Sequence, residues 1–269
     1  MTTTRWRPSP FMLLSAACHV AVLVLLVVAW RWWPVLLLVL VVDHLAMTAA
    51  GLWPRSTLLG PNVVKLPPAA CARREIAITI DDGPDPAVTP QVLDILARHG
   101  AKATFFCVGK RAALHPDLCR AIVAAGHDIE NHGQRHPNTA SLMGARGWHA
   151  EIDGAQRTLA SITGRPPRFY RAVAGLRNPF LDPVLHRLGL RLATWSARGF
   201  DTRCGDPHTV LARLLARTRP GAILLLHDGH AARMRDGAPV IVGTLPLLLH
   251  ELRERGLNPV TLSQAFASP

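Results

Sequence analysis

The chain has 269 residues, which allows one or two domains, and 49% of them are apolar, which is enough for a large core. Its formal net charge is +12, yet it contains no long run of Lys or Arg and no basic motif interleaved with aromatic residues. We therefore expect no nucleic-acid partner. The positive charge either faces anionic membrane lipid or a phosphate-bearing substrate, or forms a solvated arginine-rich surface. No protein partner is evident from the sequence.

The first 54 residues are expected to form a membrane anchor. Residues 11–30 carry no charged side chain, and a run of about 20 residues suffices to cross a bilayer as a helix. The run is too long for a signal-peptide core and no small-x-small cleavage site follows it, although an uncleaved signal is the alternative. A second apolar run, residues 34–53, contains Asp43, and a charge at that depth costs about 2.5–3.5 kcal/mol on insertion scales. We predict a transmembrane helical hairpin, with one crossing followed by an interfacial or buried helix as the alternative.

The positive charges around the two apolar runs predict their orientation. Only Arg31 lies between the runs, whereas their outer flanks carry Arg5, Arg7, Arg55, Lys65, Arg73 and Arg74. Positive charge concentrates on the cytoplasmic side of spanning helices, so a hairpin in the inner (cell) membrane would place the rest of the chain in the cytoplasm. The five cysteines agree, because their odd number and the lack of a CxxC pair predict no disulfide framework, and cytosolic thiols stay reduced. If the second run does not span, the domain lies outside.

After the apolar runs, residues 55–74 contain two proline-bearing turns and show no period, so we expect a linker. From residue 75 to residue 269, strand and helix patterns alternate. Strands are expected at residues 75–80, 103–108, 128–131, 169–171, 191–195, 222–227 and 259–262. Helices are expected at residues 89–100, 116–125, 148–163, 179–188, 207–217 and 244–255. This alternation predicts an α/β domain with a parallel sheet, either doubly wound or closed as a barrel.

Polar residues follow five of the expected strands at their carboxyl ends, where α/β barrels gather their active sites. These residues are Asp81, Asp82, His132, Arg171, Trp195 and His227. Together they supply what metal-assisted amide hydrolysis needs: a carboxylate to bind a metal, a carboxylate to act as a base, imidazole ligands, an arginine and a later histidine to act as an acid. Taken singly, each has a structural alternative, such as a turn, a helix cap or a hydrogen-bonded core histidine.

The spacing of two histidines favours a metal site. His132 and His136 are four residues apart, so on a helical turn both imidazoles face the same side. With Asp82 they make three protein ligands that leave a position open for water, which is the pattern of catalytic zinc. The alternative is coincidence, because the chain has 13 histidines.

The order of five fragments resembles the polysaccharide deacetylase family, also called the NodB-homology domain or carbohydrate esterase family 4. The fragments are Ile80 to Pro84, His132 to His136, Arg171 to Gly175, Trp195 to Asp201 and Leu224 to Asp228. The resemblance covers residues 75–269 and implies a distorted, incomplete (β/α) barrel with about seven parallel strands. It also implies a carbohydrate N-deacetylase, a hydrolase of linear amide bonds.

The resemblance assigns a role to each residue that matches a family motif. Asp81 would be the general base, with Arg171 keeping it ionised. His227 would be the general acid, with Asp201 holding it charged. The metal ligands would be Asp82, His132 and His136, binding zinc, with cobalt, nickel or manganese as alternatives.

The resemblance also places substrate contacts, and here the chain departs from the family. Leu225 shares a strand face with the residue two positions later and would line a pocket for the acyl methyl group; Gly175 and Trp195 would complete the substrate site. Val173 and Ala174 replace a proline and an aromatic residue of the family pattern. The lost aromatic wall weakens the case for a polymer-binding groove more than the case for the chemistry.

We therefore expect a membrane-anchored, metal-dependent enzyme that removes an acetyl or formyl group from an amino sugar, either lipid-linked or in a cell-envelope glycan. One alternative is a periplasmic deacetylase of peptidoglycan or an exopolysaccharide. Another is a catalytically inactive metal- or sugar-binding module of a membrane assembly. The presence of both Asp81 and His227 argues against the inactive module, because binding alone needs neither.

Overall fold

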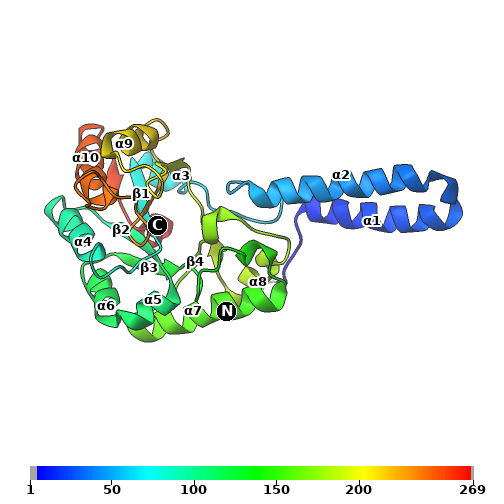
Figure 1. Cartoon of the computed structure of the whole chain (residues 1–269), viewed down its shortest axis with the longest axis horizontal. Coiled ribbons are helices and arrows are strands. Elements are labelled where there is room, and N and C mark those ends of the chain that lie inside the picture. The colour runs from blue at the N-terminus through cyan, green and yellow to red at the C-terminus, as the bar shows by residue number, and fades with distance from the viewer. Residues whose placement is uncertain (1–4, 268–269) are drawn as a thin grey trace.

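The computed structural model describes residues 5–267, in which a two-helix arm precedes an α/β barrel (Figure 1). The helices are α1 (Pro10–Val28), α2 (Trp33–Leu52), α3 (Pro68–Ala72), α4 (Thr89–Arg98), α5 (Gly109–Leu114), α6 (Pro116–Ala124), α7 (Ala145–Thr163), α8 (Leu181–Leu188), α9 (Pro207–Leu215), α10 (Val240–Glu254) and α11 (Leu262–Phe266). The 3-10 turns are η1 (Trp30–Trp32), η2 (Ala140–Leu142) and η3 (Val173–Gly175). The strands are β1 (Glu75–Asp81), β2 (Ala103–Cys107), β3 (Asp128–Asn131), β4 (Phe169–Tyr170), β5 (Arg191–Leu192), β6 (Ala197–Arg198), β7 (Ile223–His227) and β8 (Asn258–Pro259).

The sheet is parallel and curls into an incomplete barrel. Its order is β5-β4-β3-β2-β1-β7-β6, and β8 pairs with the start of β1. The two edge strands, β5 and β6, are consecutive in the chain, so the short segment between them runs from one edge to the other. The predicted α/β fold, a distorted and incomplete barrel, is confirmed.

The alternation of β1 determines which of its side chains face the site. Ile76, Ile78 and Ile80 are fully buried in the larger core cluster, which also holds side chains of α4 and α10. Ala77 belongs instead to the inner cluster. Because successive side chains point to opposite faces of a strand, Asp81 shares the inner face with Ala77.

Two of the expected strands differ from the structure. The strand predicted at residues 191–195 ends at Leu192, and β6 begins only at Ala197, because the chain changes sheet edges between them: Ala193 N donates to Tyr170 O at 2.9 Å, whereas Ser196 N donates to Ile223 O at 3.0 Å. The strand predicted at residues 259–262 ends at Pro259. Helix α11 follows because Thr261 and Gln264 form a capping box.

Residues 55–74, which we expect to be a linker, are packed into the barrel wall. Val63 forms a parallel bridge with Ala193, and Lys65 forms an antiparallel bridge with Ala222. Leu66 is 1% exposed. This segment occupies the gap between the two edges of the sheet, where it satisfies backbone groups that would otherwise remain unpaired.

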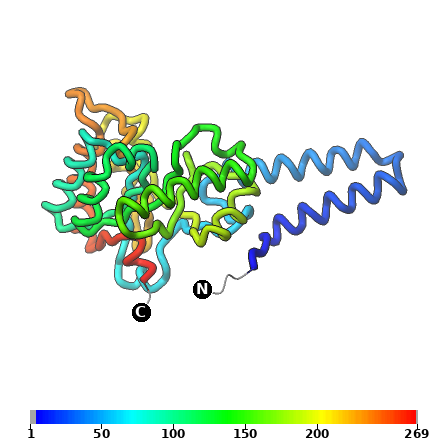
Figure 2. The backbone as a smooth tube through the Cα atoms, turned by 90° about the horizontal axis from the view of Figure 1, so that it is seen from below, coloured from blue at the N-terminus to red at the C-terminus, as the bar shows by residue number. Residues whose placement is uncertain are grey.

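The N-terminal helices α1 and α2 lie side by side and project from the barrel as one arm (Figures 1 and 2). Both are long and apolar enough to cross a membrane, and most of their large apolar side chains are exposed. By length and composition they suit either a membrane anchor or a signal sequence.

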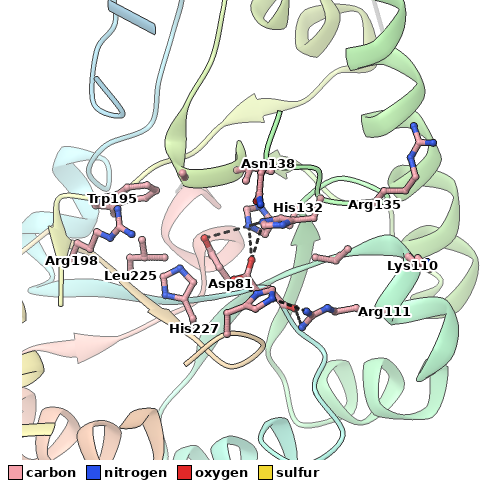
Figure 3. A pocket seen from close by; sticks show the side chains of 16 residues that line it. Asp81, Lys110, Arg111, His132, Arg135, Asn138, Trp195, Arg198, Leu225 and His227 are labelled. Atoms are coloured by element: carbon pink, nitrogen blue, oxygen red, sulfur yellow. Dashed lines mark hydrogen bonds and ion pairs between the residues drawn. The ribbon is translucent and has the colours of Figure 1, made fainter. Parts of the chain in front are cut away.

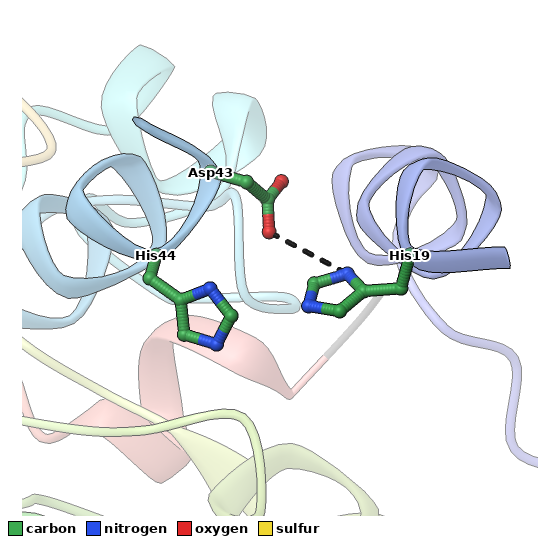
Figure 4. A group of neighbouring side chains, drawn as sticks. All are labelled: His19, Asp43 and His44. Carbon is green, nitrogen blue, oxygen red and sulfur yellow. Dashed lines mark ion pairs between the residues drawn. The ribbon is translucent and has the colours of Figure 1, made fainter. Parts of the chain in front are cut away.

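A polar cluster joins the two helices of the arm (Figure 4). Ser15 Oγ donates to Asp43 Oδ2 at 2.7 Å, and His19 Nδ1 lies 3.8 Å from the same oxygen. The His19 and His44 rings meet edge to face with centroids 5.1 Å apart. The charge of Asp43 opposes insertion of the second apolar run into a membrane. In the structure, this side chain thus contacts polar side chains of the other helix.

The base of the arm is fixed to the barrel near η3 and α8. Trp6 Nε1 donates to Asp182 Oδ2 at 2.7 Å, and Arg177 N donates to Gly51 O at 3.1 Å. A Cβ atom at Gly51 would lie 2.3 Å from Arg177 O, so only glycine permits this approach. The arm therefore joins the barrel beside the segment that follows Arg171.

Candidate active site

A cavity of about 570 Å³ opens at the carboxyl ends of the central strands (Figure 3). Asp81 ends β1, His227 ends β7, and the two residues are direct partners in the parallel pairing of these strands. His132 follows β3. The fold thus brings together residues that lie up to 146 positions apart in the sequence (227 − 81 = 146).

Three side chains converge as a metal site requires. Asp82 Oδ1 lies 3.2 Å from His132 Nε2 and 3.0 Å from His136 Nε2, and the two Nε2 atoms are 3.2 Å apart. Ligands about 2.0–2.1 Å from a tetrahedral zinc ion are separated by about 3.3 Å, so these atoms fit the corners of such a site. His132 Nδ1 lies 2.8 Å from Arg171 O, which leaves Nε2 to face the other two ligands.

The backbone is strained at two of these three residues. Asp82 has φ 74° and His136 has φ 57°, both in the left-handed region. Buried Glu151 supports the second of them by accepting a hydrogen bond from His136 N at 2.8 Å. Burial would raise the pKa of Asp82, but hydrogen bonds with His132, His136 and His230 hold it well below its usual range. The cluster therefore presents an ionised carboxylate to a cation.

A buried arginine holds Asp81. Arg171 is fully buried and donates from Nη1 to Asp81 Oδ1 at 2.6 Å and to Thr79 Oγ1 at 2.7 Å. Its Nη2 donates to Thr194 O at 2.9 Å, and its guanidinium carbon lies 4.0 Å from the centroid of the Phe106 ring. Burial lowers the pKa of Arg171, and Asp81 opposes this effect. Because every nitrogen is engaged, the guanidinium fixes the position of the Asp81 carboxylate.

A second carboxylate holds His227. Asp201 is fully buried; its Oδ1 lies 2.9 Å from His227 Nδ1, and its Oδ2 accepts from His227 N at 2.7 Å. Burial would lower the pKa of His227, but the hydrogen bond and charge of Asp201 outweigh it and raise the pKa to about 9. The imidazole is therefore protonated at neutral pH and directs its other nitrogen away from Asp201.

Of the three residues expected to contact substrate, two line the cavity and one does not. Leu225 and Trp195 line the cavity together with Asp81 and His227. Gly175 does not line it. A Cβ atom there would lie 2.6 Å from Pro54 and 2.8 Å from the Trp195 ring, and its φ is 73°. Gly175 thus lets the chain pass close behind Trp195.

His230 and Arg111 belong to the site but are not singled out by the sequence patterns. His230 Nδ1 lies 2.9 Å from Asp82 Oδ2, and Arg111 Nη1 donates to Asp82 O at 2.8 Å. The sequence signal that could have identified His230 as a site residue is its position three residues after His227. The sequence carries no such signal for Arg111, because this residue reaches Asp82 from a separate helix, α5.

Comparison with known proteins places this site in a family. A family model of polysaccharide deacetylases matches residues 70–193. The chain is 37% identical over 201 residues to a chitooligosaccharide deacetylase of Bradyrhizobium sp. (strain ANU 289), covering 71% of this chain and 90% of that protein. It is 31% identical to the peptidoglycan-N-acetylglucosamine deacetylase PgdA of Listeria monocytogenes, covering 77% of this chain and 42% of that longer protein.

Solved structures agree with these matches. A crystal structure of a peptidoglycan N-acetylglucosamine deacetylase superposes with a TM-score of 0.69 at 27% identity, covering 77% of this chain and 94% of that one. A carbohydrate esterase family 4 pseudoenzyme from Bacillus anthracis shares the fold alone, at 20% identity and a TM-score of 0.67, covering 76% of this chain and 68% of that one. The chain belongs to the polysaccharide deacetylase family. It is a hydrolase of the carbohydrate N-deacetylase class.

Proposed function

We propose that this protein is a metal-dependent N-deacylase that removes an acetyl or formyl group from an amino sugar. The observation that carries the proposal is the convergence of three units on one cavity: the Asp82 ligand cluster, the Asp81–Arg171 pair and the His227–Asp201 pair. A module that only binds metal or sugar needs neither of the two pairs.

Asp82, His132 and His136 would hold the divalent ion, for which zinc is our first choice and cobalt, nickel and manganese are alternatives. When bound, the ion polarises the acyl oxygen and lowers the pKa of a water molecule. The ligand atoms of these three residues lie 3.0–3.2 Å from one another, and the Asp82 carboxylate is buried; both observations support this assignment.

Asp81 and His227 would move the protons. Asp81 takes a proton from the attacking water, and Arg171 holds this carboxylate in position. His227 gives a proton to the nitrogen of the departing amine, and Asp201 keeps the imidazole charged until then. The two residues have opposite partners, an arginine beside Asp81 and a carboxylate beside His227.

The acyl group would lie against Leu225 and Trp195, which form the apolar side of the cavity beside His227. The sugar itself would lie beside Asp81 and His227 in this cavity, which Lys110, Arg135 and Asn138 also line. We propose a lipid-linked amino sugar as substrate, because the arm joins the barrel next to this cavity.

We further propose that α1 and α2 anchor the protein in the inner membrane with the barrel facing the cytoplasm. The pairing of Asp43 with Ser15 and His19 supports two crossings, since it reduces the cost of a charge at that depth. Fusions at Pro269 test this orientation: a fluorescent fusion should be bright and a phosphatase fusion inactive. The reverse result contradicts it.

A polymeric substrate is the second candidate. The similarity to proteins named for chitooligosaccharide and peptidoglycan deacetylation favours it. A barrel outside the cell would be required to reach peptidoglycan.

The deciding experiment measures acetate or formate released by metal-loaded, full-length protein from neutral chitooligosaccharides and from polyprenyl-diphosphate-linked N-acyl amino sugars. We expect release from at least the lipid-linked substrate, and none from the Asp81→Asn variant. If wild-type protein with bound metal releases neither acid from either class, the proposed function is wrong.

A further inference from the structure

A second cavity, of about 440 Å³, lies beside the catalytic one and is lined by four arginines. These are Arg55, Arg198, Arg213 and Arg217. Among the described residues, no aspartate or glutamate lines this cavity, and none lies within ion-pair distance of these guanidinium groups. Four positive charges therefore share one cavity without an ion pair among the described residues, and Asp201 and Asp81 attract Arg198 only from beyond ion-pair distance.

The arginines are also poor in hydrogen bonds. Arg55 Nη1 reaches Ser196 O at 3.5 Å and Arg213 Nη1 reaches Gly199 O at 3.4 Å, both near the limit of a hydrogen bond. Arg198 Nε is buried and has no partner among the described residues. Each guanidinium offers five N–H donors and prefers the bidentate geometry of carboxylate or phosphate. The cavity thus carries unused donors suited to an anion.

Aromatic rings hold these guanidinium groups in place. The Arg198 guanidinium carbon lies 4.8 Å from the centroid of Phe200 and 5.5 Å from that of Trp195. Phe200 is 46% exposed and has φ 60°, a left-handed conformation that is rare for a bulky residue. A strained, exposed aromatic residue at the rim is typical of a functional site rather than of packing.

The cavity connects the catalytic site to the end of the arm. It shares Trp195 and Arg198 with the catalytic cavity. Its opposite side is formed by Trp53, Pro54 and Arg55, the residues that directly follow the last turn of α2. Trp53 is 60% exposed, as expected of a tryptophan at a membrane surface. A molecule that enters the catalytic cavity from the bilayer would pass this arginine cluster.

We propose that this cavity binds the phosphate or diphosphate group of a lipid-linked amino sugar whose acyl group lies in the catalytic cavity. This inference rests on the proposed N-deacylase function and specifies its substrate: sugar at Asp81 and His227, phosphate at the four arginines, and lipid chain toward α2. A neutral glycan would leave the arginine donors unused, so the cavity distinguishes the two substrate classes.

The test compares two ligands that differ only in the phosphate. Full-length protein carrying Asp81→Asn, which prevents turnover, is placed in phosphatidylcholine nanodiscs. Binding is measured for polyprenyl-diphosphate N-acetylglucosamine and for the matching polyprenyl glycoside without phosphate. We expect the diphosphate to bind at least about tenfold more tightly, as the loss of a hydrogen bond to a charged group predicts.

The arginine dependence is tested with Arg55→Gln combined with Arg217→Gln. This variant should lose the preference for the diphosphate while binding the neutral glycoside as before, which also shows that it is folded. Arg146→Gln, an exposed arginine of α7 outside the cavity, should change neither ligand. Equal binding of both ligands to the unsubstituted protein, or equal weakening of both by the double variant, would overturn the inference.

Two further measurements are needed. One distinguishes the possible sources of the anion, and the other distinguishes failure of this inference from failure of the proposed function. If phosphatidylglycerol in the discs occupies the cavity with the same arginine dependence and displaces the sugar ligand, the site binds bulk anionic lipid and the substrate assignment is wrong. Acetate release by wild-type protein from either substrate class tests the deacylase function alone. If the protein without arginine substitutions shows no preference for the diphosphate while wild-type protein still releases acetate, only the inference is refuted.

Discussion

Residues 5–267 contain two clusters of the same composition, each made of one aspartate and two histidines, and the structure gives them different chemistry. At the barrel, both Nε2 atoms converge on one Asp82 oxygen at 3.0–3.2 Å. In the arm, His19 Nδ1 lies 3.8 Å from Asp43 Oδ2, and the His19 ring meets the His44 ring edge to face. Of these two clusters, only the one at the barrel has the ligand separations of a tetrahedral metal site.

The arm cluster is better explained as a clamp between α1 and α2. His44 Nδ1 lies 2.9 Å from Leu40 O, one turn earlier in its own helix, and Asp43 accepts a hydrogen bond from Ser15. A polar group buried in lipid needs a partner, and such interhelical contacts connect spanning helices. The same two residue types thus serve helix pairing in one place and ligand binding in the other.

The largest effect should come from removing a barrel ligand. His132→Ala should abolish the stoichiometric metal, because only two ligands remain, and should lower turnover by more than about 100-fold. His19→Ala should retain one ion per chain and near wild-type turnover in detergent. Metal content and acetate release from the same preparations check both. Full activity of His132→Ala in chelator-treated buffer would contradict the assignment.

Removing the base should separate chemistry from binding. Asp81→Asn should keep the metal and lose about 10²–10⁴-fold in turnover, because a neutral amide cannot take the proton. Asp94→Asn, an exposed carboxylate of α4, is the matched control and should be active. If Asp81→Asn turns over like the control, the proton acceptor is another group.

The third effect is a shift in pH dependence. His227 must be protonated to act as the acid, and its pKa is about 9, so turnover should fall as pH rises through this value. Asp201→Asn removes the charge that raises this pKa, so the fall should move to lower pH. A pH–rate profile of both proteins checks this. An unchanged alkaline limb in Asp201→Asn would exclude His227 as the acid.

The same pKa affects stability in a defined direction. Its value in the folded protein lies above the ordinary 6.5 of an unfolded histidine. The stabilisation from the His227–Asp201 pair is therefore fully present below about pH 6.5 and is lost as pH rises through about 9. The midpoint of denaturant unfolding should decrease over this window in wild-type protein.

Local sequence patterns were sufficient where the structure depends on local rules. The period-two isoleucines of β1 predicted a strand at residues 75–80 with Asp81 directly after it, and the structure extends this strand to Asp81, which pairs with His227 of β7. The capping residues Thr261 and Gln264 also carried a local signal that the strand prediction at residues 259–262 overlooked. In both cases, the information lies within a few neighbouring residues.

Other features depend on contacts between distant segments and leave little trace in the sequence. Val63 lies in the barrel wall because its backbone binds Leu192 O and Thr194 N, which no periodicity of residues 55–74 reveals. Arg198 and Arg217 appear in the sequence as ordinary surface arginines. Only the fold shows that they share one cavity next to Trp195.

The smallest effect should come from the clamp in the arm. Asp43→Leu removes the Ser15 hydrogen bond but also removes a charge that is costly in lipid, so the two changes oppose each other. Interhelical hydrogen bonds in membranes contribute about 0.6 kcal/mol on average. We therefore expect near wild-type orientation and metal content, with the two helices less firmly paired.

The measurement is a cysteine crosslink between positions 22 and 36, which are both buried in the hairpin. A crosslink between positions 15 and 43 is unsuitable, because it would replace the residues whose contact is being tested. If wild-type protein instead binds a second ion that Asp43→Leu lacks, the arm cluster is a ligand site, and the distinction drawn from the ligand separations fails.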